Sequence, residues 1–279
     1  MKIFIFLLLL ILPFLIHSSL LAQDTPEQFY RMATGYLNAR EYEQAVYYYT
    51  ECLKGYPNLS LVHERRGTAY MLMKKYDEAL SDYTEAIRIN ISNAMAYLGR
   101  GTVYMLQGYY DDAISDFNLA VQYDMYNIHS YLNRAETYIK MKEYSPALSD
   151  LNHAAQINPN HPDVYKLRGL VRFFQTEYDL ALKDFDLSLN LNNLNYETFM
   201  YRGDLLYIMR KYEDALVDFN RAIELNGYYA ELYVKRGYTY SALTKYQEAM
   251  NDFNTAIQLD HNYKSNLFQI MDEIKKKQQ

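Results

Sequence analysis

A 34-residue period constrains this chain more than any other feature of its 279 residues. The segment RGTVYMLQGYYDDAISDFNLA, which begins at Arg100, has counterparts that begin at Arg66 and Arg202. A period of this length is the mark of a repeat array, in which each repeat packs only against its neighbours. Two residue types show that seven repeats keep one register: Tyr42, Tyr76, Tyr110, Tyr144, Tyr178, Tyr212 and Tyr246, and Ala45, Ala79, Ala113, Ala147, Ala181, Ala215 and Ala249.

Each repeat has the pattern of two amphipathic helices joined by a tight turn. In the third repeat, Tyr97, Gly101 and Tyr104 follow one another at three- and four-residue steps, which place them on one face of a helix. Gly108 interrupts that pattern, and the apolar stripe of a second helix follows, with Phe117 on it. A single hairpin of this kind cannot bury its own apolar face, so we expect an all-α solenoid of stacked hairpins.

Small and aromatic residues recur at fixed places in the repeat, as the packing of large against small side chains requires. The alanines given above should lie where two helix backbones approach, so Ala113→Phe should over-pack a helix contact and cost roughly 1–3 kcal/mol. The small residues of first helices are Gly67, Gly101, Ala135, Gly169, Gly203 and Gly237. The aromatic residues between them are Tyr131, Tyr165, Phe199 and Tyr233 on first helices and Phe117, Phe185, Phe219 and Phe253 on second helices.

These residues make the repeats resemble tetratricopeptide repeats (TPRs). The third repeat carries that family's pattern through Tyr97, Gly101, Tyr104, Tyr110, Ala113, Phe117 and Ala120. The resemblance implies a right-handed superhelical solenoid at 23–263, and an amphipathic stripe beyond it indicates a C-terminal capping helix at 264–279. His63, Leu151 and Arg172 depart from the pattern, because aromatic residues are usual at their positions. The predicted repeats are 26–59, 60–93, 94–127, 128–161, 162–195, 196–229 and 230–263.

The N-terminus is typical of an exported protein. Lys2 precedes an apolar run from Ile3 to Ile16, and small or polar residues follow that run. This order predicts a secretory signal peptide at residues 1–22, cut before Gln23, and a periplasmic or secreted protein. The alternative is an uncleaved signal anchor, which would leave the protein attached to a membrane by its N-terminus.

Six arginines each precede an aspartate by 16 residues, a spacing that brings the two side chains together across a helical hairpin. We predict partly buried ion pairs that fix how each hairpin seats against its neighbour, rather than a ladder of ligand sites. The pairs are Arg66 and Asp82, Arg100 and Asp116, Arg134 and Asp150, Arg168 and Asp184, Arg202 and Asp218, and Arg236 and Asp252.

Composition and motifs argue against nucleic-acid binding, metal binding and catalysis. A net charge of −6 argues against a nucleic-acid partner, because such proteins present a basic face to phosphate. The six histidines are scattered, and the sequence holds neither a helix-spaced zinc pair nor a phosphate-binding glycine loop. Cys52 is expected to be a small buried hydrophobic residue rather than a nucleophile. We therefore predict no enzyme activity, no cofactor and no metal.

The resemblance places the functional surface on the concave face, which first helices line at repeat positions two, five, nine and twelve. These positions are mostly apolar or aromatic, and they suit an apolar helix or extended segment of a protein. The lysine–asparagine pair with which some family members clamp the acidic tail of chaperones is absent. The predicted groove residues are Met95, Leu98, Thr102, Met105, Leu132, Glu136, Ile139, Lys166, Leu170, Phe173, Met200, Asp204 and Tyr207.

The function predicted from the sequence is an exported scaffold that binds a protein or peptide in this apolar groove. A preformed surface loses little ordering entropy on binding. Leu98 should lie on an open surface, so Leu98→Glu should leave the fold largely intact; alternatively, some groove side chains pack against adjacent helices and the groove is wetter. A second hypothesis is a membrane-anchored structural or assembly factor of the cell envelope, with the solenoid as a spacer and membrane contact only through the uncleaved leader.

Overall fold

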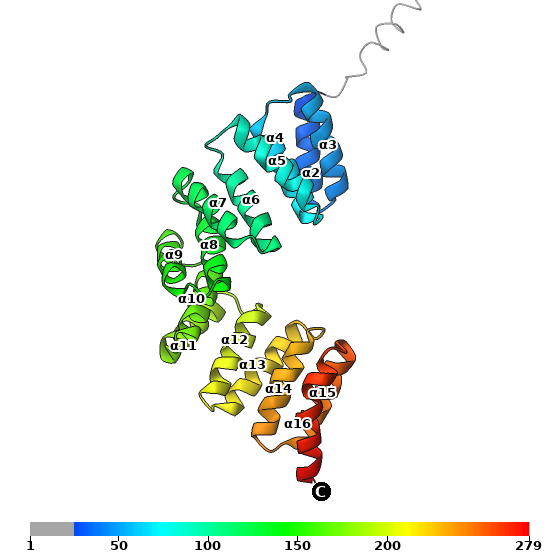
Figure 1. The fold of residues 1–279 in the computed structure, drawn as a ribbon, viewed down its shortest axis with the longest axis vertical. Coiled ribbons are helices and arrows are strands. Elements are labelled where there is room, and N and C mark those ends of the chain that lie inside the picture. Colours follow the sequence, from blue (N-terminus) through cyan, green and yellow to red (C-terminus); the bar gives the residue numbers. More distant parts are fainter. Residues whose placement is uncertain (1–24, 279) are drawn as a thin grey trace, which may run out of the picture. The chain divides into compact units, whose positions relative to one another are not determined.

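The computed structural model describes residues 25–278. The predicted signal peptide at 1–22 and its cleavage site lie outside the described residues. Within 25–278 the chain forms fifteen α-helices and no strand, which confirms the all-α solenoid of hairpins (Figure 1). The helices fall into two compact units, an N-terminal unit that ends at Ser130 and a C-terminal unit that begins at Tyr131.

The N-terminal unit contains three helical hairpins. A capping box starts the first of them: the Thr25 hydroxyl accepts from the Gln28 N–H, the Gln28 side chain accepts from the Thr25 N–H, and Pro26 opens the helix. Each hairpin packs on the next through its second helix. The helices are α2 (Pro26–Asn38), α3 (Tyr42–Gly55), α4 (Ser60–Leu72), α5 (Tyr76–Ile89), α6 (Ala94–Gln107) and α7 (Tyr110–Tyr123), followed by the start of α8 (Ile128–Lys140).

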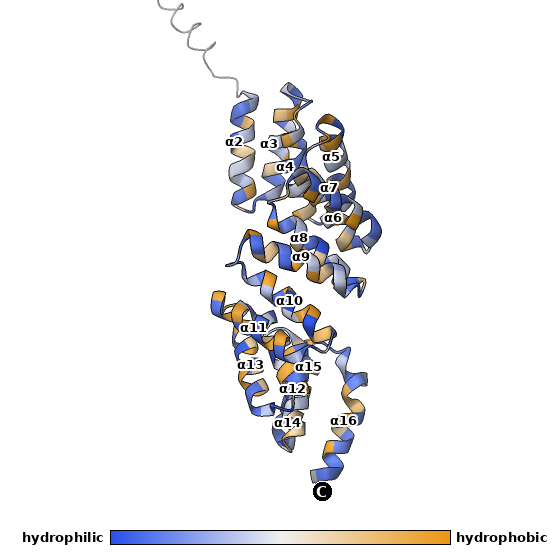
Figure 2. Ribbon diagram, turned by 90° about the vertical axis from the view of Figure 1, so that its left-hand side faces the viewer, coloured by the Kyte–Doolittle hydropathy of each residue, from blue (hydrophilic) through white to orange (hydrophobic). Residues whose placement is uncertain are grey.

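The C-terminal unit continues the same pattern, and Figure 2 shows that its helices carry hydrophobic and hydrophilic residues side by side. The last helix packs on α15 through Leu267 and Ile274, which are buried in one cluster with Phe253. The helices after α8 are α9 (Tyr144–Ile157), α10 (Pro162–Phe174), α11 (Tyr178–Leu191), α12 (Tyr196–Ile208), α13 (Tyr212–Leu225), α14 (Ala230–Ala242), α15 (Tyr246–Leu259) and α16 (Tyr263–Gln278).

Each hairpin turn contains one residue in the left-handed conformation, which ends the first helix. Gly108 is the one glycine among these residues, and Thr176 and Thr244 adopt the same conformation although they are β-branched. In each turn a backbone N–H reaches back to a carbonyl near the helix end, as from Glu41 to Tyr36 at 2.9 Å. The left-handed residues are Arg40, Lys74, Gly108, Lys142, Thr176, Arg210 and Thr244.

The small residues of the repeat lie where aromatic rings cross a helix backbone. All seven repeated alanines of second helices are completely buried. A Cβ on Gly169 would lie 2.7 Å from Cε1 of Phe185, too close for an unstrained contact. The fourth repeat has Ala135 in place of this glycine, and it has Leu151 in place of the ring. The aromatic ring of the second helix therefore explains the glycine of the first.

All six predicted arginine–aspartate ion pairs form. In the sixth repeat, Nε and Nη2 of Arg202 donate to the two carboxylate oxygens of Asp218 at 2.8 and 2.7 Å, and Asp218 is buried. Nη1 of Arg202 also donates to Asp186, on the second helix of the preceding repeat, at 2.7 Å. The guanidinium lies over the ring of Phe199 at 5.8 Å. Every one of the six arginines thus joins its own hairpin internally, and five of them also bond to the hairpin before: Arg66, Arg100, Arg168, Arg202 and Arg236.

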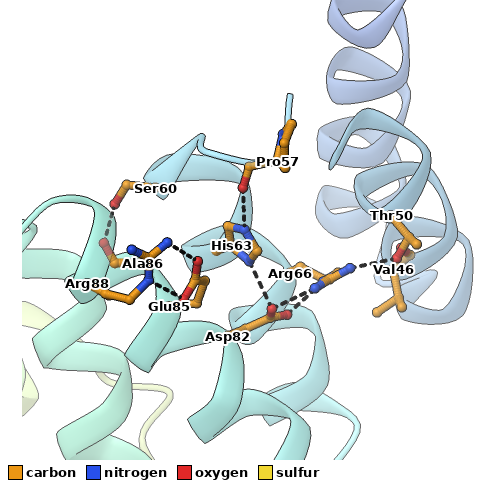
Figure 3. A network of polar contacts seen from close by, with 10 residues as sticks. All are labelled: Val46, Thr50, Pro57, Ser60, His63, Arg66, Asp82, Glu85, Ala86 and Arg88. Atoms are coloured by element: carbon orange, nitrogen blue, oxygen red, sulfur yellow. Dashed lines mark hydrogen bonds and ion pairs between the residues drawn. The ribbon is translucent and has the colours of Figure 1, made fainter. Parts of the chain in front are cut away.

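Two residues that depart from the repeat pattern, His63 and Arg172, each contact the ion-paired aspartate of their own repeat. His63 replaces the aromatic residue of the second repeat, and its Nδ1 lies 3.2 Å from Asp82, the partner of Arg66 (Figure 3). The hydrogen bond to Asp82 raises the pKa of His63 above its ordinary value, although burial opposes this effect. In the fifth repeat, Nη1 of Arg172 donates to Asp184 at 2.7 Å, so this carboxylate holds two guanidinium groups.

Cys52 lies in the core of the N-terminal unit, packed with Ala33, Leu37 and Val62. Burial raises the pKa of its thiol, which disfavours the reactive thiolate. This confirms the prediction of a small buried hydrophobic residue.

Candidate binding groove

The predicted groove residues of the N-terminal unit lie on α6 and differ in exposure. Met95 is 43% exposed, whereas Leu98 and Met105 are 7% and 9% exposed and belong to a core cluster with Phe117. Thr102 is half-buried, and its hydroxyl donates to the carbonyl of Leu98 at 2.7 Å. The prediction that Leu98 lies on an open surface is therefore wrong, because its side chain packs against the neighbouring helices.

The predicted groove residues of the C-terminal unit fall into two groups. Leu132 on α8 and Met200 on α12 are buried, so they support helix packing and offer little surface to a partner. The remaining residues are half-buried on first helices: Glu136, Ile139, Lys166, Leu170, Phe173, Asp204 and Tyr207. The accessible part of this face is thus more charged than the sequence indicated. The binding role of these residues stays a prediction.

Residues of α8, α10 and α12 surround a hollow of about 230 Å³, which we name the Lys166 hollow. The Lys166 side chain is held between two helices: its Nζ lies 2.9 Å from Glu197 on α12 and 3.0 Å from Asp163 on α10. Burial favours the neutral amine, but the Glu197 hydrogen bond and the two carboxylate charges outweigh it and raise the pKa of Lys166. The residues around the hollow are Glu136, Ile139, Lys140, Lys166, Leu167, Leu170, Glu197 and Tyr201.

A second hollow, of about 320 Å³, lies farther along the same unit and is named the Lys235 hollow. Nζ of Lys235 donates to Asp204 on α12 at 2.8 Å and lies 3.0 Å from Glu231 on its own helix, α14. The two carboxylates outweigh burial and raise the pKa of Lys235. The residues around the hollow are Asp204, Tyr207, Phe219, Lys235 and Tyr238.

The two hollows and the acids that contact their lysines carry more negative than positive charge. Three carboxylates and three ammonium groups line the hollows, and Asp163 and Glu231, which contact Lys166 and Lys235, add two further negative charges beside them. The ammonium groups hold acids from successive first helices in place, so the carboxylates are fixed before any partner arrives. The acids are Glu136, Asp163, Glu197, Asp204 and Glu231, and the bases are Lys140, Lys166 and Lys235.

Sequence reasoning missed several residues of these hollows. Glu197 occupies repeat position two, and Tyr238 occupies position nine of the seventh repeat, so an extension of the same rule to every repeat finds both. Lys235 occupies position six, which the rule leaves out. Its contact depends on how α12 and α14 sit against one another, and no spacing within one repeat reports this.

Sequence models of the tetratricopeptide repeat match several parts of the chain. A model described as "TPR repeat" matches residues 67–108. Two models described as "Tetratricopeptide repeat" match the remaining ranges, which are 29–59, 94–124, 128–161 and 230–263. Together the matches span more than half of the chain. No curated protein sequence matches the chain at a significant level.

Solved structures resemble the chain at low sequence identity, so the likeness concerns the fold. Cut9–Hcn1 of the APC/C aligns with a TM-score of 0.73 at 16% identity. The alignment covers 85% of this chain and 46% of the other chain, so this chain corresponds to about half the length of that structure. A tetratricopeptide repeat protein from Parabacteroides merdae aligns with a TM-score of 0.68 at 19% identity, over 89% of this chain and 96% of that one. YrrB, described as a TPR protein with an unusual peptide-binding site, aligns with a TM-score of 0.50 at 20% identity, over 65% of this chain and 93% of that one.

Proposed function

Because the chain belongs to the tetratricopeptide repeat family, whose members typically act as non-enzymatic scaffolds for protein–protein interaction, we propose that it is an exported scaffold that binds a segment of a partner protein. The proposed site is the first-helix face of the C-terminal unit, formed by the Lys166 and Lys235 hollows. The partner segment carries basic side chains. Peptide binding by the similar protein YrrB supports a peptide-sized ligand.

The observation that carries this proposal is the placement of fixed carboxylates beside apolar and aromatic walls. Asp204 and Tyr207 on α12 line the Lys235 hollow together with Tyr238 on α14. A carboxylate beside aromatic rings suits an arginine or lysine side chain, through a charge-assisted hydrogen bond and a cation–π contact. Because Lys235 already holds Asp204 in position, little side-chain freedom is lost on binding.

Binding is tested with the purified full chain and an array of extended peptides that are basic, acidic or neutral. We expect the basic peptides to bind, and we expect Asp204→Asn and Glu197→Gln to weaken them. Glu224→Gln is the matched control, because Glu224 is an exposed carboxylate on the second helix α13. Added salt should weaken binding further, since exposed charge pairs are screened. Preference for acidic peptides, or equal loss in the control, would contradict the proposed site.

Export is tested by the intact mass of the protein recovered from its source cell. A chain that begins at Gln23 indicates a cleaved signal peptide and a released scaffold. A chain that begins at Met1 supports the membrane-anchored alternative. Recovery of the protein in the cytoplasmic fraction would contradict both.

A further inference from the structure

The turns between successive repeats of the N-terminal unit expose large apolar side chains. Leu59, Ile91 and Tyr126, one from each of three turns, are 42%, 69% and 74% exposed, and Met125 beside Tyr126 is also exposed. We name these four residues the turn edge. Two of the inter-repeat turns of the C-terminal unit likewise expose Leu194 and Tyr228. A single exposed apolar residue is ordinary, whereas exposure in successive inter-repeat turns calls for a reason.

The turn edge is one continuous side of the N-terminal unit, as hydrogen bonds between successive repeats show. Nδ2 of Asn93, in the turn before α6, donates to the hydroxyl of Ser60, the first residue of α4, at 2.9 Å. Asn127, in the turn before α8, donates to the sulfur of Met95 on α6 at 3.3 Å. The inter-repeat turns therefore lie next to one another, opposite the hairpin turns at the other ends of the helices.

The tips of these turns are almost free of charge, and their polar groups are satisfied internally. Asp124 is the one charged residue within 56–59, 90–93 and 124–127, and its carboxylate accepts from the N–H of Tyr126 at 3.2 Å. The side chain of Asn90 accepts from the N–H of Ser92 at 3.1 Å in the same way. The apolar residues thus sit on tight turns that can enter a less polar medium at small cost in lost hydrogen bonds.

Two basic side chains near the turn edge are paired within their own helices. Lys54 bonds to Glu51 at the end of α3, and Arg88 bonds to Glu85 at the end of α5. A surface that recognises anionic lipid presents an excess of lysine and arginine. The turn edge has none, so its chemistry matches a neutral surface.

The start of the folded array lies at the same edge. The hydroxyl of Tyr56, at the end of α3, donates to Glu27, in the first turn of α2, at 2.8 Å. Beside them a hollow of about 600 Å³ opens, with Leu59 and Leu61 among its walls. The chain before Thr25, which includes the apolar run from Ile3 to Ile16, therefore joins the fold at the turn edge. None of the helices within residues 25–278 is both long and apolar enough to cross a membrane.

We propose that the turn edge is a lipid-contact surface that rests on the interface of a zwitterionic bilayer. Tyrosine and aliphatic side chains on neutral turns suit the boundary between headgroups and acyl chains. The chain before Thr25 joins the fold at the turn edge and not at the edge formed by the hairpin turns. If that segment enters a membrane, the turn edge is therefore the side of the unit that lies nearest to it. The proposal is independent of the groove, and it adds a second membrane contact to the leader predicted from the sequence.

The test uses the absence of tryptophan from the chain, because one introduced tryptophan then reports its own surroundings. Three variants of the full chain, with the leader verified by intact mass, carry Ile91→Trp, Tyr126→Trp or Leu106→Trp. Leu106 is the matched control: it is 55% exposed but lies at the far end of α6 from the turn edge. Each folded variant is mixed with phosphatidylcholine vesicles, with and without brominated acyl chains as quenchers.

We expect vesicles to shift the emission of the variants at 91 and 126 to shorter wavelength, and the brominated lipid to quench both. The variant at 106 should show neither effect. An unchanged spectrum at 91 and 126, or equal quenching at all three positions, would overturn the proposal. A shift that appears only with phosphatidylserine would overturn the neutral surface, and a shift that grows with protein concentration without vesicles would assign the edge to self-association instead.

Discussion

The contact between Gly169 and Phe185 supports a quantitative prediction about the core of the repeat. A Cβ at position 169 would lie 2.7 and 2.8 Å from two ring atoms of Phe185, against about 3.5–4.0 Å for an unstrained carbon contact. Because the ring is completely buried, it must displace its neighbours. We expect over-packing to cost roughly 1–3 kcal/mol, and the helix propensity of alanine to offset about 1 kcal/mol. Gly169→Ala should therefore destabilise the protein by about 0–2 kcal/mol.

The fourth repeat supplies the matched background, because it combines Ala135 with Leu151. In a Phe185→Leu protein the ring is absent, so Gly169→Ala should stabilise by about 1 kcal/mol. The effect of alanine should thus differ by roughly 1–3 kcal/mol between the two backgrounds. Urea denaturation of the four proteins, followed by circular dichroism of the helices, measures this difference.

Gly35 is the internal control, because a Cβ there meets no neighbouring group within 4 Å. Gly35→Ala should stabilise the protein by about 0.5–1 kcal/mol through helix propensity alone. If Gly169→Ala stabilises to the same degree in both backgrounds, the ring contact does not explain the glycine and the reasoning is refuted.

Three further predictions concern single side chains. The pKa of His63 is higher in the folded protein than in the unfolded chain, so its pairing with Asp82 stabilises the fold fully below the unfolded-state pKa and less as pH rises through the folded-state pKa. The urea midpoint of wild type minus that of His63→Gln should therefore be larger at about pH 5.5 than at about pH 8.5. An equal difference at the two pH values would contradict this prediction. Thr176→Gly should stabilise the protein by about 0.5–1 kcal/mol, because glycine removes the strain of a β-branched residue in the left-handed conformation, although glycine also loses more chain entropy on folding. A lower urea midpoint for the variant would count against this strain. Leu98→Glu should destabilise the protein by roughly 2–5 kcal/mol, because it places a carboxylate in the core. Met95→Glu should change the stability by less than about 0.5 kcal/mol, because Met95 is exposed. Equal unfolding midpoints for the two variants would show that the burial of Leu98 is wrongly assigned.

The fold and the ion pairs could be predicted because both depend on spacing within one repeat. A separation of 16 residues brings Arg202 and Asp218 together in any hairpin whose turn lies midway, and the structure confirms it. The all-α solenoid follows from the same regularity, since a hairpin with one apolar face must stack.

Exposure on the first-helix face could not be predicted in this way. Leu98 and Met200 are buried in clusters that also contain a side chain from a neighbouring repeat, Ile87 and Leu232 respectively, and the pattern of a single repeat does not predict such contacts. The pairing of Lys235 with Asp204 likewise joins two repeats, at positions that do not match. Sequence analysis named Asp204 from its position alone, and its partner emerged from the contact between α12 and α14.

The arginine ion pairs also bear on how such an array changes in length. Each buried aspartate is neutralised by an arginine of its own hairpin, as Asp252 is by Arg236, and the bond of this arginine to the preceding repeat goes to the neutral side chain of Asn220. Removal or duplication of a whole hairpin therefore leaves each of these aspartates with its own guanidinium, whereas a pair divided between repeats would leave an unpaired charge in the core. A gene for such a chain can gain or lose 34 codons at a time, with the arginine that neutralises each buried aspartate carried along in the same segment.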